Sequence, residues 1–272
     1  MNLFNLFTEI EKEDPQVYNR IDDRRRALRS MGSFSGKVLL AALPLAIGSL
    51  FKKAYGQTTP SSVLDVLNYA LTLEYLEAEF YTMGVASNGL IPAADVAGIT
   101  AIRDHENAHV TFLRTAIQGA GGTPVAKPTF DFTAGGAYAN VFTNYDTFLA
   151  VSQAFEDTGV RAYKGQAANL VSNKAVLTAA LNIHSVEARH AAHVRRVRMT
   201  RGASVKPWIT GKDTGGIPSV QAVYNGEEVT TQGGVAITNI NGFAISANAA
   251  SEAFDEPLTS AEVLAIVRPF IK

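Results

Sequence analysis

Two Glu-x-x-His pairs in apolar, helix-length segments constrain most strongly what this chain can fold into. Each pair is preceded, 32 or 31 residues earlier, by another glutamate that has a tyrosine seven residues after it. The chain therefore contains an internal repeat of chemically active side chains. Its members are Glu74, Tyr81, Glu106 and His109 in the first half, and Glu156, Tyr163, Glu187 and His190 in the second.

Each of the four glutamates falls in the apolar stripe of its predicted helix. Positions i±4 and i±7 share a helix face with position i. Among the positions so related to the four glutamates, only Ser152, Tyr81 and Tyr163 carry a polar group, and none is charged. A buried carboxylate costs several kcal/mol of free energy unless it is paired or binds a metal. Four carboxylates and two imidazoles converging from four helices are typical of a dinuclear metal centre.

The segments that carry these residues resemble the ferritin-like superfamily, especially the exported branch that includes plant desiccation-related proteins and bacterial relatives. The resemblance covers about residues 60–200. It implies an all-α fold, a ferritin-like four-helix bundle with a long connection between its second and third helices. The segments that carry it are Leu73–Tyr81, Glu106–His109, Phe155–Val160 and Val186–His190.

The resemblance also implies a role for each ligand. In that family the glutamate of each Glu-x-x-His pair, here Glu106 and Glu187, bridges both metals, and the histidine binds one of them. The earlier glutamate of each half is a terminal ligand. A mixed carboxylate–imidazole set suits two divalent ions, with iron favoured and manganese as the alternative. The implied ligands are Glu74, Glu106, His109, Glu156, Glu187 and His190.

Glu77 is the alternative to Glu74 as a ligand from the first helix. The two positions lie about 60° apart around a helix of 3.6 residues per turn. The internal repeat favours Glu74, because Glu74 corresponds to Glu156 whereas Glu77 corresponds to Gly159. We therefore expect Glu77 at the rim of the site, around the ligands.

Tyr81 and Tyr163 share the ligand face of their helices, two turns from Glu74 and Glu156. They are expected close to the ligands, where they could hydrogen-bond a ligand glutamate or carry radical equivalents. The alternative is that they are ordinary core tyrosines.

The remaining histidines lie about 60–120° away from the apolar stripes by the same helical period. We expect them around the ligands or at the surface. Two aspartates are candidates for orienting the ligand histidines by hydrogen bonding. The histidines are His105, His184 and His193, and the aspartates are Asp104 and Asp157.

The bundle is expected within residues 57–201. The hydrophobic pattern and the turn residues predict helices over about 62–83, 93–118, 145–171 and 173–201. Residues 119–144 are rich in Gly, Pro, Thr and Asn, so we interpret them as the long connection between the two halves.

Residues 202–272 are expected to form an extension with little regular structure that packs on the bundle. A hairpin is predicted between Asn225 and Ile240, around Gln232-Gly233-Gly234. The capping-box pattern from Thr259 to Glu262 predicts a short helix that docks on the bundle.

Residues 1–56 resemble a twin-arginine export signal. The segment Arg24–Arg29 has two arginines, any residue, two apolar residues and a base. The 14-residue apolar run from Val38 to Phe51 is short for a membrane span and typical of a signal peptide core. We expect cleavage after Gly56 and export to the periplasm or cell envelope, with an uncleaved membrane-proximal helix as the alternative.

Composition excludes several classes of function. The chain has no Cys, which excludes thiol catalysis, disulfides and Cys-ligated iron–sulfur clusters. Its net charge is −1, which argues against nucleic acid as a main partner. No stable membrane span is expected in the mature chain, and a homo-oligomer remains open.

The function implied is that of an exported di-metal protein that reacts with dioxygen or peroxide, in metal oxidation or in protection against oxidative stress. Whether it is an enzyme is left open; if it is one, it is a di-iron or di-manganese oxidoreductase. One alternative is manganese catalase-like disproportionation of peroxide. Another is a non-enzymatic structural or binding protein associated with stress.

Overall fold

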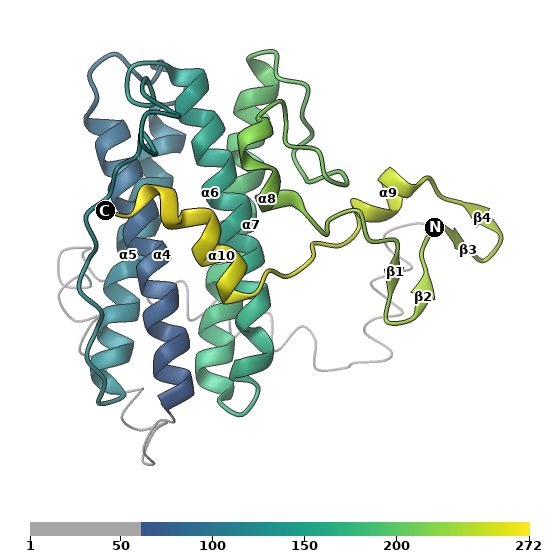
Figure 1. The fold of residues 1–272 in the computed structure, drawn as a ribbon, viewed down its shortest axis with the longest axis horizontal. Coiled ribbons are helices and arrows are strands. Elements are labelled where there is room, and N and C mark those ends of the chain that lie inside the picture. The colour runs from purple at the N-terminus through teal and green to yellow at the C-terminus, as the bar shows by residue number, and fades with distance from the viewer. Residues whose placement is uncertain (1–60) are drawn as a thin grey trace, which may run out of the picture. The chain divides into compact units, whose positions relative to one another are not determined.

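The computed structural model describes residues 61–272, and the predicted export signal lies outside this part of the chain. Four long helices form a bundle, with elements labelled as in Figure 1. None of the described helices is long and apolar enough to cross a membrane. The four helices are α4 (Ser61–Ala86), α5 (Val96–Gly119), α6 (Tyr145–Gln166) and α7 (Lys174–Thr200).

The bundle consists of two closely packed helical pairs, α4 with α5 and α6 with α7. Each pair has a short connection, whereas residues 120–144 run along the length of the bundle before α6 begins (Figure 1). The helices α5 and α6 are consequently parallel, which confirms the all-α bundle with a long crossover. The third helix is shorter than expected, because the chain tightens after Gln166 into the 3-10 helix η1 (Ala167–Leu170).

A cluster of aromatic rings joins α4, α6 and the crossover in one half of the bundle. Phe80 of α4 is fully buried and stacks on Phe148 of α6, with ring centroids 4.8 Å apart. Phe132 of the crossover packs edge-on against Phe80 at 5.3 Å. Gly84 leaves room for the Phe148 ring, which a side chain at that position would overlap. The crossover is therefore part of the core.

The extension contains two short hairpins. The predicted one is present, with Gly233-Gly234 as its turn. A second follows at Asn241-Gly242, where both residues have the positive φ values, 53° and 79°, that such tight turns need. The strands are β1 (Thr231–Gln232), β2 (Val235–Ala236), β3 (Asn239–Ile240) and β4 (Phe243–Ala244).

Short helices make up most of the remaining regular structure of the extension. The capping box predicted at Thr259 and Glu262 is present and begins α10, which packs on α6. Near the end of the described chain, Ile271 forms a β-bridge with Phe130 of the crossover. The helices are η2 (Pro218–Val220), α8 (Gln221–Tyr224), α9 (Ala247–Ser251), α10 (Ser260–Val267) and η3 (Arg268–Phe270).

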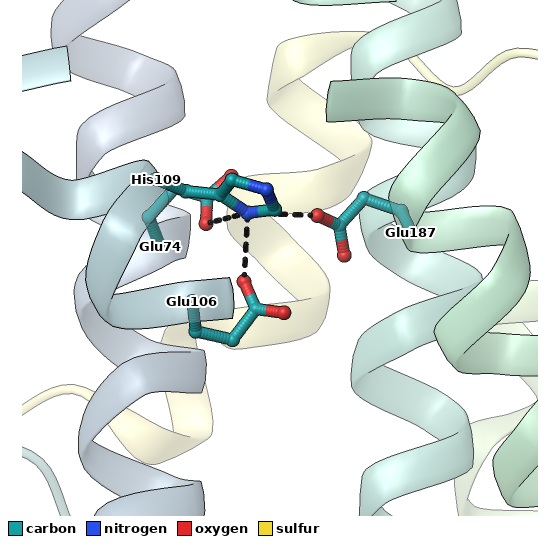
Figure 2. Close-up of side chains that lie close together, drawn as sticks. All are labelled: Glu74, Glu106, His109 and Glu187. Carbon is teal, nitrogen blue, oxygen red and sulfur yellow. Dashed lines mark hydrogen bonds and ion pairs between the residues drawn. The ribbon is translucent and has the colours of Figure 1, made fainter. Parts of the chain in front are cut away.

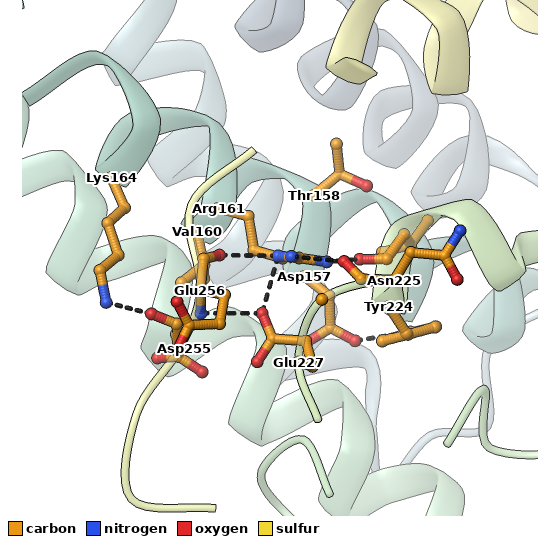
Figure 3. Close-up of polar contacts among 12 residues, drawn as sticks. Asp157, Thr158, Val160, Arg161, Lys164, Tyr224, Asn225, Glu227, Asp255 and Glu256 are labelled. Atoms are coloured by element: carbon orange, nitrogen blue, oxygen red, sulfur yellow. Dashed lines mark hydrogen bonds and ion pairs between the residues drawn. The ribbon is translucent and has the colours of Figure 1, made fainter. Parts of the chain in front are cut away.

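Arg161 of α6 anchors the extension through a buried ion pair. Its side chain is 1% exposed, and its Nε lies 2.7 Å from Oε1 of Glu227, which is buried to the same degree. The same guanidinium donates to backbone carbonyls of the extension, including Asn225 at 2.9 Å and Glu256 at 2.8 Å (Figure 3). This buried, paired and hydrogen-bonded charge connects α6 with two segments of the extension, around Glu227 and at Glu256.

A second buried arginine pairs with α6 one turn before Arg161. Arg195 of α7 is paired with Asp157 of α6, with Nη2 and Oδ2 2.5 Å apart. The hydroxyl of Tyr224 in α8 donates to the same carboxylate at 2.7 Å. The extension thus supplies polar partners as well as apolar contacts to the outer side of the bundle.

We expect Glu227→Ala to lower the free energy of unfolding by about 3–5 kcal/mol, because it leaves Arg161 buried and unpaired. Urea denaturation followed by circular dichroism measures this change. The matched control is Glu228→Ala, whose exposed pair with Lys212 is worth about 0–1 kcal/mol. Equal and small losses in both variants would contradict a structural role for the buried pair.

Candidate metal centre

The structure brings all six expected ligands together in the bundle core, from all four long helices. Their side chains form two groups, and within each group the possible ligand atoms lie within 4.8 Å of one another. Glu106 and Glu187 belong to both groups. The first group is Glu74, Glu106, His109 and Glu187 (Figure 2), and the second is Glu106, Glu156, Glu187 and His190.

In the first group, three carboxylates surround one nitrogen of His109. Its Nδ1 lies 3.1 Å from Oε2 of Glu74, 3.2 Å from Oε2 of Glu106 and 3.2 Å from Oε1 of Glu187 (Figure 2). All three glutamate side chains are 0% exposed. The group thus gathers one nitrogen and several oxygens, and its three carboxylates are closed off from solvent.

The second group has the same form around His190. Its Nδ1 lies 2.7 Å from Oε1 of Glu106 and 3.3 Å from Oε2 of Glu156. Oε2 of Glu187 is 3.8 Å away. The two groups therefore repeat one arrangement about the shared carboxylates of Glu106 and Glu187.

The possible ligand atoms are suited to binding metal ions, because many of them have no hydrogen-bond partner within residues 61–272. Six of them are buried without a hydrogen-bond partner among the described residues, although other ligand atoms are close. Buried polar atoms of native proteins are normally satisfied, and a bound cation satisfies several at once. Oxygen donors with one imidazole per group suit iron, manganese or zinc. The six atoms are Oε1 of Glu106, both oxygens of Glu156 and Glu187, and Nδ1 of His190.

A model of the ferritin-like domain family matches residues 62–200, just over half of the chain. The chain belongs to the ferritin-like family. The match coincides with helices α4 to α7 and contains every expected ligand, and it leaves the extension outside. No curated protein sequence matches the chain.

Histidines and carboxylates strongly perturb one another in this ferritin-like core. Burial and the charges of Glu187 and Glu74 raise the pKa of Glu106 well above its usual value. Burial opposes ionisation of Glu187 too, but contacts with His109 and His190 outweigh it and lower its pKa to about 2. Burial likewise opposes the charge on His190, yet Glu156 and its other carboxylate neighbours raise its pKa to about 12. Without metal, the neighbouring carboxylates thus favour the protonated, positively charged form of both histidines by raising their pKa values.

Glu77 lies around the ligands and outside both ligand groups, as expected, but it is buried in the ferritin-like core. The Glu77 side chain is 3% exposed. Oε1 of Glu77 and Oε2 of Glu187 both lie close to the backbone of Gly159. A Cβ at position 159 would lie 3.3 and 3.4 Å from these two oxygens, so glycine leaves room for both. A rotation of about 60° from Glu74 is too small to carry a side chain out of the bundle. The sequence signal of this placement is the glycine that corresponds to Glu77 in the internal repeat, because Gly159 leaves space for the Glu77 carboxylate.

The two tyrosines of the repeat both lie beside ligands. The hydroxyl of Tyr163 donates to Oε1 of Glu74. Tyr81 is fully buried, and burial together with the charge of Glu156 raises its pKa well above the usual value. Tyr163 thus has the expected role of holding a ligand carboxylate, whereas the hydroxyl of Tyr81 is buried without a hydrogen-bond partner among the described residues.

The aspartates do not orient the ligand histidines. Asp104 is exposed and accepts from Arg103, while Asp157 is occupied by Arg195 on the outer side of α6. His105 touches a ligand instead: its Nδ1 lies 2.9 Å from Nε2 of His190. The helical period placed His105 off the stripe but could not show that it reaches across to α7.

The other two histidines have roles away from the ligands. Nδ1 of His184 lies 3.0 Å from the carbonyl oxygen of Val160. His193 packs against the backbone of Gly98 in α5, at a point where a side chain would overlap its ring.

We expect Glu77→Gln to stabilise the metal-free protein at neutral pH. Burial and four neighbouring glutamates raise the pKa of Glu77 well above 4.5 in the folded state. The folded protein therefore holds a proton that the unfolded chain releases, and its stability falls as pH rises from about 4.5 through the raised pKa. Glutamine cannot ionise, so the variant avoids this loss.

Thermal melts in the presence of a chelator, from pH 5 to pH 8, measure the difference. The gain should be largest at high pH and should shrink towards pH 5. Glu79→Gln is the control on the same helix, because Glu79 is partly exposed and pairs with Lys127; such surface changes are worth within about 0.5 kcal/mol. A metal-free Glu77→Gln protein that melts below wild type at pH 7 would contradict this account.

Proposed function

We propose that the protein is an exported ferritin-like protein with a dinuclear metal centre, with iron favoured, that reacts with dioxygen or peroxide. Its role would be metal oxidation or protection against oxidative stress. The observation that supports this most directly is that Glu106 and Glu187 are shared by the two ligand groups. A carboxylate common to two adjacent donor sets is what a pair of metal ions requires.

The side chains would hold both ions and control access to them. Two reduced metal ions can together supply two electrons to one oxidant molecule, which avoids release of one-electron products. Glu106 and Glu187 would fix the distance between the ions, and Tyr163 would orient Glu74 through its hydrogen bond. The four glutamates are 0% exposed, so bulk water is kept from the centre.

The first test is metal stoichiometry. We expect metal-free wild type to take up about two Fe(II) per chain under anaerobic conditions. Glu187→Ala should reduce this to one or none, because it removes a ligand from both groups. It should also remove the stabilisation that metal gives the fold, which is about 2.7 kcal/mol at a metal concentration 100 times the dissociation constant. Metal analysis and melting curves measure both effects.

Glu79→Ala is the matched control, since it deletes a carboxylate of α4 that pairs with Lys127 outside both groups. It should keep two metals. The same preparations then separate the candidate reactions. Dioxygen or peroxide consumption by the Fe(II) form supports the proposal, whereas oxygen evolution from peroxide by the Mn(II) form supports a catalase. Two-metal uptake that fails in wild type would favour a non-enzymatic protein.

We also propose that residues 1–56 direct export through the twin-arginine route. The support is the sequence pattern from Arg24 to Arg29 and the apolar run that follows it. Changing Arg24 and Arg25 to lysine should retain the protein in the cytoplasm, as cell fractionation and N-terminal sequencing would show. Normal export of the double variant would exclude this route and leave the metal centre untouched.

A further inference from the structure

His105 gives the ligand His190 a partner on the side facing away from the carboxylates. Nδ1 of His105 and Nε2 of His190 are 2.9 Å apart. The planes of the two rings are 11° from parallel, and the ring centroids are 5.2 Å apart. Since Nδ1 of His190 faces Glu106 and Glu156, its two nitrogens have separate tasks.

We propose that His105 is a positioning residue that holds His190 for metal binding and makes the two metal positions unequal in affinity. This inference rests on the proposed dinuclear centre. It concerns the ligand group that contains His190, and it leaves the group around His109 unchanged.

The hydrogen bond fixes which nitrogen of His190 can bind a metal. A neutral imidazole carries its proton on one nitrogen and a lone pair on the other. If Nε2 of His190 donates to Nδ1 of His105, the lone pair of His190 lies on Nδ1, which faces the carboxylates. A partner of this kind also fixes the ring orientation and makes the ligand more basic.

The other ligand histidine lacks such a partner. Every hydrogen bond and ion pair that the His109 ring forms within residues 61–272 involves Nδ1, and none involves Nε2. In the internal repeat, the position corresponding to His105 is Val186, one residue before Glu187. A valine side chain cannot accept a hydrogen bond, so the repeat is broken at this position and the two metal positions differ.

Anaerobic titration of metal-free protein with Co(II) tests the proposal, with calorimetry for the affinities and visible absorption for the ligand field. Wild type should bind two ions with distinguishable constants. His105→Ala should weaken one of them by about 10–100-fold, the usual effect of losing such a partner. It should also change the absorption of that ion alone, and leave the other constant within about twofold.

Two further variants separate positioning from general damage. His105→Gln keeps an acceptor oxygen on a side chain of similar reach and should restore part of the affinity. Val186→Ala changes the corresponding position of the other half and should leave both constants within about twofold. Because His105 is exposed, the metal-free His105→Ala protein should melt close to wild type.

Several outcomes would overturn the proposal. Two constants unchanged in His105→Ala, or both weakened equally, would exclude a role specific to His190. An equal loss of affinity in His105→Gln and His105→Ala would assign the effect to disruption of the helix surface. If wild type itself binds no pair of Co(II) ions, the dinuclear centre fails together with this inference, whereas normal binding by wild type and variant removes only the role of His105.

Discussion

The packing of five buried glutamates and two histidines in the core of the bundle is the constraint on which the rest of the structure depends. Carboxylates crowded in this way repel one another and lose their hydration, so the fold needs cations among them. In the metal-free chain, His109 and His190 supply positive charge by holding extra protons. Metal ions would displace those protons. The carboxylate charges would then be balanced by the metal ions instead of by the protonated histidines.

The helix α6 is unusual in that both of its sides are buried. Glu156 faces the ligand centre, while Asp157 and Arg161 face the extension and take part in buried ion pairs there. All residues from Val151 to Tyr163 are buried. The extension therefore stabilises the helix that supplies Glu156 to one ligand group and Tyr163, which contacts Glu74 of the other. Its apolar part includes Val220, Val223 and Tyr224, which pack against Ala154 of the same helix.

The sequence sufficed to predict features that depend on one helix or on the internal repeat. The period of apolar residues located the four helices, and the repeat singled out Glu74 over Glu77 as the counterpart of Glu156. Features that depend on contacts between elements were missed. Asp157 has the right spacing to lie near His190, but Arg195 and Tyr224 draw its carboxylate to the opposite side. For His105 the helical period allowed a place around the ligands or at the surface, but it could not show that the side chain reaches His190 on a neighbouring helix. The second hairpin was also overlooked, although Asn241-Gly242 is a typical signal for it.

The covering of α6 by the extension has a consequence for the timing of folding. The covering residues, from Val205 to Ile271, follow all four bundle helices in the sequence, so they leave the ribosome after those helices. Until then, Asp157 and Arg161 lack the partners Tyr224 and Glu227. A nascent chain with four complete helices would thus still have one side of α6 uncovered, with Arg161 lacking its carboxylate partner.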